Sequence, residues 1–183
     1  VKYITELAQS KADLEAFLAD PSRYGRMVYA NLLKDALGSL TPGGDIRMLA
    51  ASGDPEQPAY VEGFGAGREL RIKVLGPVPE TDAAGRPRLR WFRDRPDGGS
   101  LDVGKTKNGH SILLKVEYRD VSVLLGGDLN ASAEAFLLQH YTGIPWRSPD
   151  SNADPTLIEA ARRHFGADIV KCCHHGSADF TAA

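Results

Sequence analysis

The sequence predicts a mixed fold of α-helices and β-strands without internal repeats, and three patterns support this fold class. Apolar residues at three- and four-residue spacing predict helices in the first forty residues. Alternating apolar and polar residues predict a hairpin in the middle, and a helical pattern leads into a last strand. The 183 residues suit one domain over 1–183, with a helical stretch over 1–40 and the core strands and site from about 46 to 183.

The composition is that of a soluble globular protein, with 42% hydrophobic and 25% charged residues. A formal net charge of −2 gives no bulk sign of nucleic-acid binding. No apolar run approaches the ~20 residues of a membrane span, and no signal-peptide pattern is present. The only cysteines, Cys172 and Cys173, are neighbours that are not expected to pair with each other, so we expect a reducing, cytoplasmic location.

Two helices are predicted at the start of the chain. Ser10 with Asp13 resembles a capping box, and Asp20-Pro21 ends the first helix. A longer helix is expected from about Ser22 to the stop signal at Thr41–Gly44. Its apolar stripe comprises Tyr24, Met27, Val28, Leu32, Leu33, Leu37 and Leu40.

The next segments alternate between short strands and connections. Residues 46–50 and 70–74 are expected to form strands, and residues 52–67 a loop. Residues 78–107 are polar and rich in proline, glycine and arginine, which predicts a long connection.

Five arginines flank Trp91 and Phe92 within this connection. Such a cluster can cradle phosphates and stack a base, so Arg88, Arg90 and Arg93 are candidate substrate-binding residues. The alternative is a solvated loop with one aromatic side chain anchored in the core.

A hairpin is predicted from Ile112–Tyr118, a turn at Arg119-Asp120 and Val121–Leu125, with Lys115 and Glu117 facing water. Next, Asn130 is expected to cap a helix that runs through about His140. Asp154-Pro155 begins another helix that ends at Gly166 and leads into the strand Ile169–Cys173. His140 and His164 lie near helix ends and are interpreted as structural.

Candidate metal ligands follow two of these strands directly. Gly126-Gly127-Asp128 follows one strand, and His174-His175-Gly176-Ser177 follows the other. Glycine leaves room beside each ligand for an ion. A carboxylate can bridge two ions, and imidazoles complete each ion's shell without adding charge.

These motifs, together with Asn108-Gly-His-Ser111 before the hairpin, resemble the second half of a metallo-β-lactamase-fold hydrolase. The resemblance is closest to the hydrolase domain of DNA-uptake competence channel proteins and their stand-alone relatives. It covers roughly residues 68–183. The family's His-x-His-x-Asp-His signature does not occur in this sequence. Because the sequence starts at Val1 and stops at Phe180–Ala183, just after the second motif, we expect a segment cut at both ends.

The resemblance implies a four-layer αββα sandwich and a hydrolase that uses two Zn²⁺ ions, or Mn²⁺, to activate a hydroxide. It implies a phosphodiester substrate in a nucleotide or nucleic acid, as in a phosphodiesterase or nuclease. Asp128 and His174 are the expected ligands, and His175 the expected catalytic proton donor. His110, Asn108 and Ser177 are further candidates for metal binding or for hydrogen bonding around the site.

Two alternative functions remain open. The chain could be a catalytically inactive module of the same fold that binds a partner. Gly99–Thr106 also matches the P-loop expression, with Lys105 as the phosphate ligand, but the residues around it do not form the required strand–loop–helix pattern. The oligomeric state is not fixed by the sequence.

Overall fold

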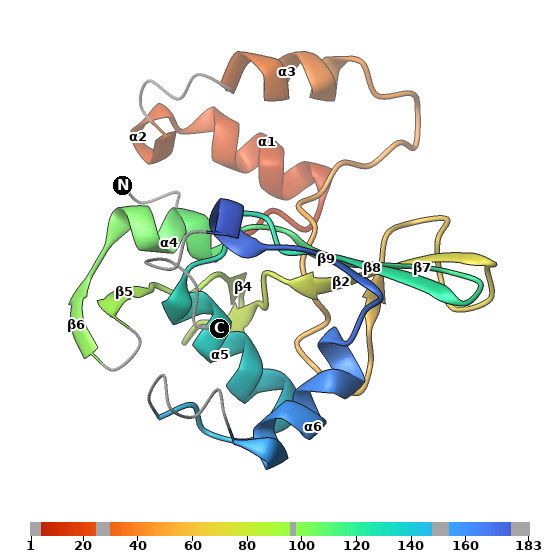
Figure 1. Cartoon of the computed structure of the whole chain (residues 1–183). Helices are drawn as coiled ribbons and strands as arrows, with labels where there is room; N and C mark the ends of the chain where they lie inside the picture. The colour runs from red at the N-terminus through yellow and green to blue at the C-terminus, as the bar shows by residue number, and fades with distance from the viewer. Residues whose placement is uncertain (1–4, 25–29, 96–97, 148–153, 177–183) are drawn as a thin grey trace. The chain divides into compact units, whose positions relative to one another are not determined.

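The computed structural model describes residues 5–24, 30–95, 98–147 and 154–176. These residues form a mixed α and β fold, as the sequence predicts, and their strands pair mostly antiparallel (Figure 1). The chain divides into two compact units. One comprises Val1–Met48 with Thr81–Leu89, and the other comprises Leu49–Glu80 with Arg90–Ala183.

The first unit is mainly helical, with α1 (Lys11–Ala19), α2 (Pro21–Tyr24) and α3 (Ala30–Gly38). The predicted cap is confirmed, because the Ser10 hydroxyl accepts a hydrogen bond of 3.1 Å from the Asp13 amide. Met27 and Val28 of the predicted stripe lie outside the described residues. The buried core of this unit consists of Ala8, Leu14, Phe17, Leu18 and Ala30.

The predicted strand at residues 46–50 is wrong. This segment makes single backbone contacts in place of a ladder, such as the 2.8 Å hydrogen bond from the Met48 amide to the Ala8 carbonyl. Further along the chain, β3 (Glu80–Thr81) and β4 (Pro87–Arg88) form a separate two-stranded ladder.

The second unit contains a five-stranded sheet in the order β1-β2-β7-β8-β9. Its strands are β1 (Ala59–Tyr60), β2 (Leu70–Gly76), β7 (Leu113–Tyr118), β8 (Val121–Leu125) and β9 (Ile169–Lys171). The predicted hairpin is confirmed as β7 and β8. The pairing is antiparallel except between β8 and β9, which run parallel.

Residues 78–107 are more regular than the predicted connection. Besides β3 and β4 they contain β5 (Arg93–Arg95) and β6 (Gly98–Leu101), and helix α4 (Val103–Gly109) begins among them. The Asp102 carboxylate caps α4 by accepting a 2.6 Å hydrogen bond from the Lys105 amide. This cap stabilises a helix in a segment whose many glycine and polar residues predict a loop.

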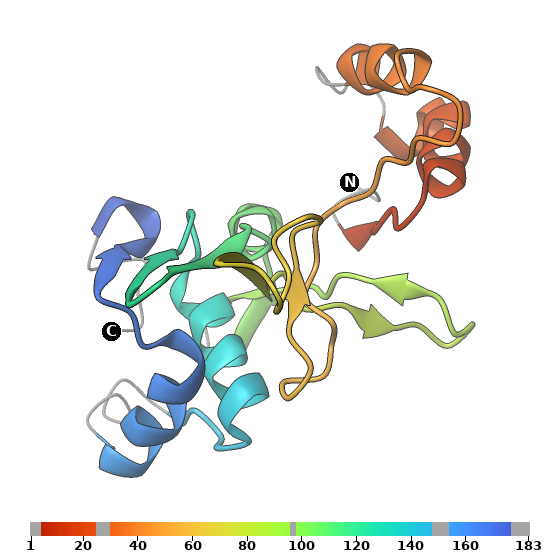
Figure 2. The same cartoon turned by 90° about the vertical axis from the view of Figure 1, so that its right-hand side faces the viewer.

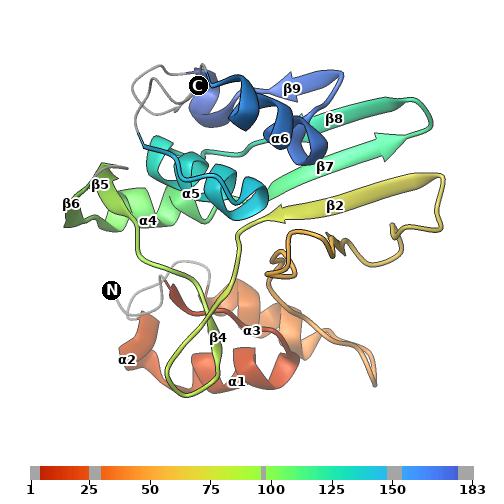
Figure 3. The ribbon, with the colours of Figure 1, turned by 90° about the horizontal axis from the view of Figure 1, so that it is seen from below.

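Two helices cover one face of the sheet, α5 (Ala131–Thr142) and α6 (Pro155–Phe165), as three views show (Figures 1, 2 and 3). Both predicted N-caps are confirmed, because Asn130 accepts from the Ala133 amide and Asp154 accepts from the Thr156 amide. The helices connect β8 to β9 and so allow these two strands to lie parallel.

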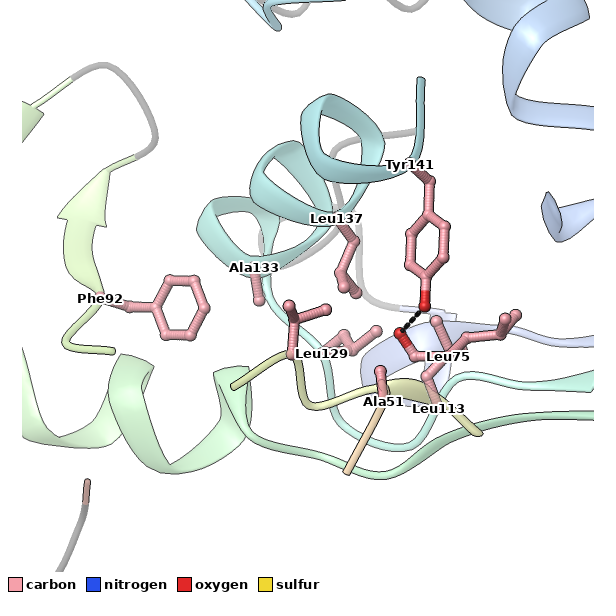
Figure 4. Close-up of a cluster of buried hydrophobic side chains, with 9 residues drawn as sticks. Ala51, Leu75, Phe92, Leu113, Leu129, Ala133, Leu137 and Tyr141 are labelled. Carbon is pink, nitrogen blue, oxygen red and sulfur yellow. Dashed lines mark hydrogen bonds between the residues drawn. The ribbon is translucent and has the colours of Figure 1, made fainter. Parts of the chain in front are cut away.

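The main core lies between this sheet face and α5 (Figure 4). The sheet side contributes Leu75 and Leu113, and α5 contributes Leu137 and Tyr141. The Tyr141 hydroxyl donates a 2.9 Å hydrogen bond to the Leu75 carbonyl, which satisfies its one polar group inside the core.

Lys115 does not face water as predicted. Only 8% of it is exposed, because it lies on the helix-covered face together with Leu113. Its ammonium group lies 3.8 Å from the Glu117 carboxylate, which also pairs with Lys73 at 3.0 Å and Arg71 at 3.1 Å. A charged cluster therefore continues the core toward the hairpin end of the sheet.

Across the described ranges, none of the helices combines the length and the apolar character that a bilayer crossing requires.

Candidate functional site

The two predicted metal-binding motifs meet at one edge of the sheet. Strands β8 and β9 are parallel neighbours, with Leu125 opposite Lys171, so their carboxyl ends lie side by side. Gly126-Gly127-Asp128 leaves the first strand, and Cys173–Gly176 forms a short 3₁₀ turn just after the second. Carboxyl ends of adjacent parallel strands are a common position for ligand sites in α/β sheets.

The side chains of Asp128 and His175 bring the two motifs into contact. The Nε2 atom of His175 lies 3.3 Å from Oδ1 of Asp128. The His175 side chain is 77% exposed and the Asp128 side chain is 46% exposed, so both remain open to solvent and to a ligand.

His174 is held against the main chain of the other motif. Its amide donates a 3.2 Å hydrogen bond to the Gly127 carbonyl, and its ring Nδ1 lies 3.5 Å from the Asp128 carbonyl oxygen. A contact of this kind at Nδ1 helps to set the orientation of the imidazole ring.

The two histidines adopt a backbone conformation that side chains rarely occupy. The φ angles of His174 and His175 are 42° and 58°, in the left-handed region. Such residues each cost on the order of 1–3 kcal/mol and cluster at functional sites. The strained turn directs the two consecutive imidazoles toward the Asp128 turn.

The glycines of the first motif allow this close approach. A Cβ at Gly126 would overlap the Cys173 sulfur, and a Cβ at Gly127 would lie 2.8 Å from Ser111 Cβ. Gly127 also has a positive φ of 59°. Only glycine fits at either position without displacing a neighbour.

Ser111 contacts the main chain of the first motif. Its hydroxyl accepts a 3.0 Å hydrogen bond from the Asp128 amide. Asn108 belongs to α4, and its carbonyl accepts a 3.0 Å hydrogen bond from the Ser111 amide. Ser177 lies outside the described residues.

His110 makes its contacts away from the Asp128 carboxylate. Its Nε2 lies 2.9 Å from the Arg90 carbonyl, and its ring centroid lies 5.4 Å from that of Phe92. Burial lowers the pKa of His110 to about 4, so the ring is neutral near pH 7. The residue lines a pocket of only about 10 Å³, which has room for a water molecule but not for a substrate.

The three candidate arginines belong to two units and make different contacts. Arg88 belongs to β4 in the first unit. Arg90 pairs with Glu80 at 3.4 Å and lies over the Phe136 ring, 4.1 Å from its centroid. Arg93 donates to the Gly99 carbonyl. Their role in substrate binding stays a prediction.

The P-loop-like segment uses its polar groups internally. The Asp102 carboxylate occupies the Lys105 amide at the start of α4, where a P-loop would present amides to a phosphate. Thr106 is fully buried, and its hydroxyl donates a 2.6 Å hydrogen bond to the Asp102 carbonyl. The segment is a strand followed by a capped helix, and its geometry favours a structural role.

His140 and His164 pack among aromatic side chains, in agreement with their structural interpretation. The His140 ring lies 4.9 Å from Tyr141, and the His164 ring lies 5.1 Å from Tyr141 on centroid distances. Burial lowers the pKa of both histidines.

The donor types at the sheet edge, one carboxylate and two imidazoles, are ligands that Zn²⁺ binds in proteins. Two donors on one tetrahedral zinc are separated by about 3.3–3.4 Å, which matches the 3.3 Å between His175 Nε2 and Asp128 Oδ1. Over the described ranges, no group of three or more His, Cys, Asp or Glu side chains is close enough to hold a metal. Within the described residues, Asp128, His174 and His175 therefore do not by themselves form a complete metal site.

No family model, no curated protein and no solved structure matches this chain.

Sequence reasoning missed two residues that build the site. Lys171 donates a 2.7 Å hydrogen bond to the Gly127 carbonyl, and Cys173 packs against Gly126. Both contacts join segments that are far apart in the chain. The one sequence signal that could have identified these two residues is their position next to the histidine pair along the chain.

Proposed function

We propose that this chain is a metal-dependent hydrolase of the metallo-β-lactamase fold that acts on phosphodiester bonds. The observation that carries the proposal is the meeting of Asp128 with His174 and His175 at the ends of two parallel strands. The family assignment is supported by the residues of three motifs, Asn108–Ser111, Gly126–Asp128 and His174–Ser177, and by their order along the chain.

The exposed sheet face supports the four-layer fold as part of this proposal. Cross-strand pairing puts apolar residues in rows on the face opposite α5 and α6, as in the row Ile72, Val116, Val123 and Ile169. Val121, Leu125 and Ile169 on this face are exposed. An apolar sheet face of this kind is typical of a layer that packs against a second sheet.

In the proposed site, Asp128 and His174 would hold two Zn²⁺ or Mn²⁺ ions. When bound, the metal acts as a Lewis acid that lowers the pKa of a coordinated water and stabilises negative charge on the attacked phosphoryl group. His175 is exposed and can donate a proton from its imidazole to the leaving-group oxygen.

A second role for His175 follows from its distance to Asp128. Because the 3.3 Å separation is that of two donors on one zinc, His175 is also a candidate ligand. The variants His174→Ala and His175→Ala separate the roles. If His175 is a proton donor and not a ligand, its removal lowers kcat by about 10²–10⁴ and leaves the metal affinity unchanged. If His175 is a ligand, its removal lowers the metal affinity.

Hydrolysis of bis(p-nitrophenyl) phosphate in the presence of Mn²⁺ or Zn²⁺ tests the proposal. We expect turnover that falls to background in Asp128→Asn and persists in Asp120→Asn, a change in the β7–β8 turn. Metal binding without turnover of this diester, thioesters or lactones would instead support the inactive binding module.

The free thiols of Cys172 and Cys173 are consistent with a cytoplasmic protein.

A further inference from the structure

The peptide unit that joins Gly127 to Asp128 is held at both of its polar atoms. Its carbonyl, on Gly127, accepts hydrogen bonds from the Lys171 ammonium group at 2.7 Å and from the His174 amide at 3.2 Å. Its N–H, on Asp128, donates to the Ser111 hydroxyl at 3.0 Å.

Holding both polar atoms of a peptide unit limits the directions open to the side chain that follows. The unit is planar, so its orientation is set once the carbonyl and the N–H each have a partner. Gly127 precedes it with φ 59°, and glycine alone would let the plane rotate at little energetic cost. The partners on Ser111, Lys171 and His174 therefore hold the peptide plane from which the Asp128 side chain extends.

Lys171 makes the shortest of these contacts and is the one side-chain donor to the carbonyl among the described contacts. A charged donor forms a stronger hydrogen bond than a neutral amide. Lys171 is the last residue of β9, opposite Leu125 in the parallel register, so its position depends on the sheet and not on the histidine turn.

We propose that Lys171 is a positioning residue for the metal site. By holding the Gly127 carbonyl it orients the Gly127–Asp128 peptide and presents the Asp128 carboxylate toward the imidazoles of His174 and His175. Groups that orient metal ligands typically change metal affinity 10–100-fold when they are removed. This inference rests on the proposed function for its metal readout, and it has a second readout that does not.

The test uses the full-length protein and the variants Lys171→Met, Lys171→Arg and Lys107→Met. Methionine keeps most of the side-chain length and removes the donor, and arginine restores a charged donor. Lys107 is exposed on α4 and serves as the matched control. Mn²⁺ and Zn²⁺ affinities are measured by titration calorimetry, and amide hydrogen exchange is measured for Asp128 and His174.

We expect Lys171→Met to weaken metal binding at least tenfold, Lys171→Arg to recover most of the affinity, and Lys107→Met to behave as wild type. Exchange at the Asp128 and His174 amides should accelerate in Lys171→Met without metal, because the shared peptide is no longer held. Unchanged metal affinity in Lys171→Met would overturn the inference.

A wild-type protein that binds neither metal would refute the proposed function and leave the exchange measurement to decide the role of Lys171. In that case, faster exchange in Lys171→Met supports the positioning role, and unchanged exchange overturns it.

Discussion

His175 Nε2 lies 3.3 Å from Asp128 Oδ1, although the two residues follow different strands of the sheet. The parallel pairing of β8 with β9 produces this contact, since it puts both strand ends at one edge. The α5–α6 connection makes the parallel pairing possible. The site is therefore a consequence of the topology as well as of the two motifs.

Close packing of the glycine turn predicts a large effect of Gly126→Ala. The added methyl group would overlap the Cys173 sulfur, and overpacking of this kind typically costs about 1–3 kcal/mol of unfolding free energy. Urea denaturation measures the loss. Gly65→Ala is the control, because a Cβ at Gly65 meets nothing within 4 Å.

A compensating change makes the test specific. Cys173→Ala removes the sulfur that the new methyl group meets, so the double variant should recover part of the stability lost in Gly126→Ala. Equal stability of Gly126→Ala and Gly65→Ala would show that the two strand ends do not pack this closely.

His110 predicts a stability that depends on pH. Its pKa is about 4 in the folded chain and about 6.5 in an unfolded one, because burial disfavours the charged ring. Between these values the unfolded chain binds more protons, so the contribution of His110 is full above pH 6.5 and is lost as the pH falls toward 4. His140 and His164 act in the same direction.

An NMR titration of the His110 ring, with denaturation of wild type and His110→Gln at pH 7 and pH 5, checks this expectation. The titration should give a pKa well below 6.5, and the stability of the variant should change less between the two pH values. A His110 ring that titrates at 6.5 or above would contradict the buried, neutral state.

The charged cluster under α6 predicts a strong dependence on Glu117. Glu117→Gln leaves the ammonium groups of Lys73 and Lys115 and the guanidinium group of Arg71 without their shared carboxylate. We expect a loss of about 2–3 kcal/mol in unfolding free energy. The exposed pair of Glu69 with Arg119 is the control, and Glu69→Gln should cost less than about 1 kcal/mol.

The physical cause of this difference is burial. The Glu117 side chain is 15% exposed. Burial by itself raises the pKa of Glu117, but the hydrogen bond and charge of Lys73 and the hydrogen bond of Arg71 outweigh it and lower the pKa overall. Similar losses in the two Glu→Gln variants would mean that the cluster is solvated.

The sequence predicts the parts of the fold that local patterns determine. Alternation gives the β7–β8 hairpin, and the caps Asn130 and Asp154 give α5 and α6. The Gly-Gly-Asp and His-His-Gly motifs give the site residues that lie together in the structure. In each case the signal lies within a few consecutive residues.

Features that depend on distant contacts could not be predicted in this way. The alternating pattern of β7 predicts that Lys115 is exposed. Lys115 is buried because α6 and Glu117 pack around it, which the local pattern does not indicate. Helix α4 depends on the Asp102 cap and on the Thr106 contact with Phe92. The contact of Lys171 with Gly127 exists only because β9 lies next to β8.

Metal binding to the purified protein tests the central claim most directly. Elemental analysis and titration with Zn²⁺ and Mn²⁺ should be carried out on wild type, Asp128→Asn and Asp120→Asn. We predict transition metal bound to wild type and to Asp120→Asn, and its loss from Asp128→Asn with the fold retained by circular dichroism. Equal metal content in Asp128→Asn and wild type, or no metal bound to wild type, would contradict the assignment of this strand edge as a metal site.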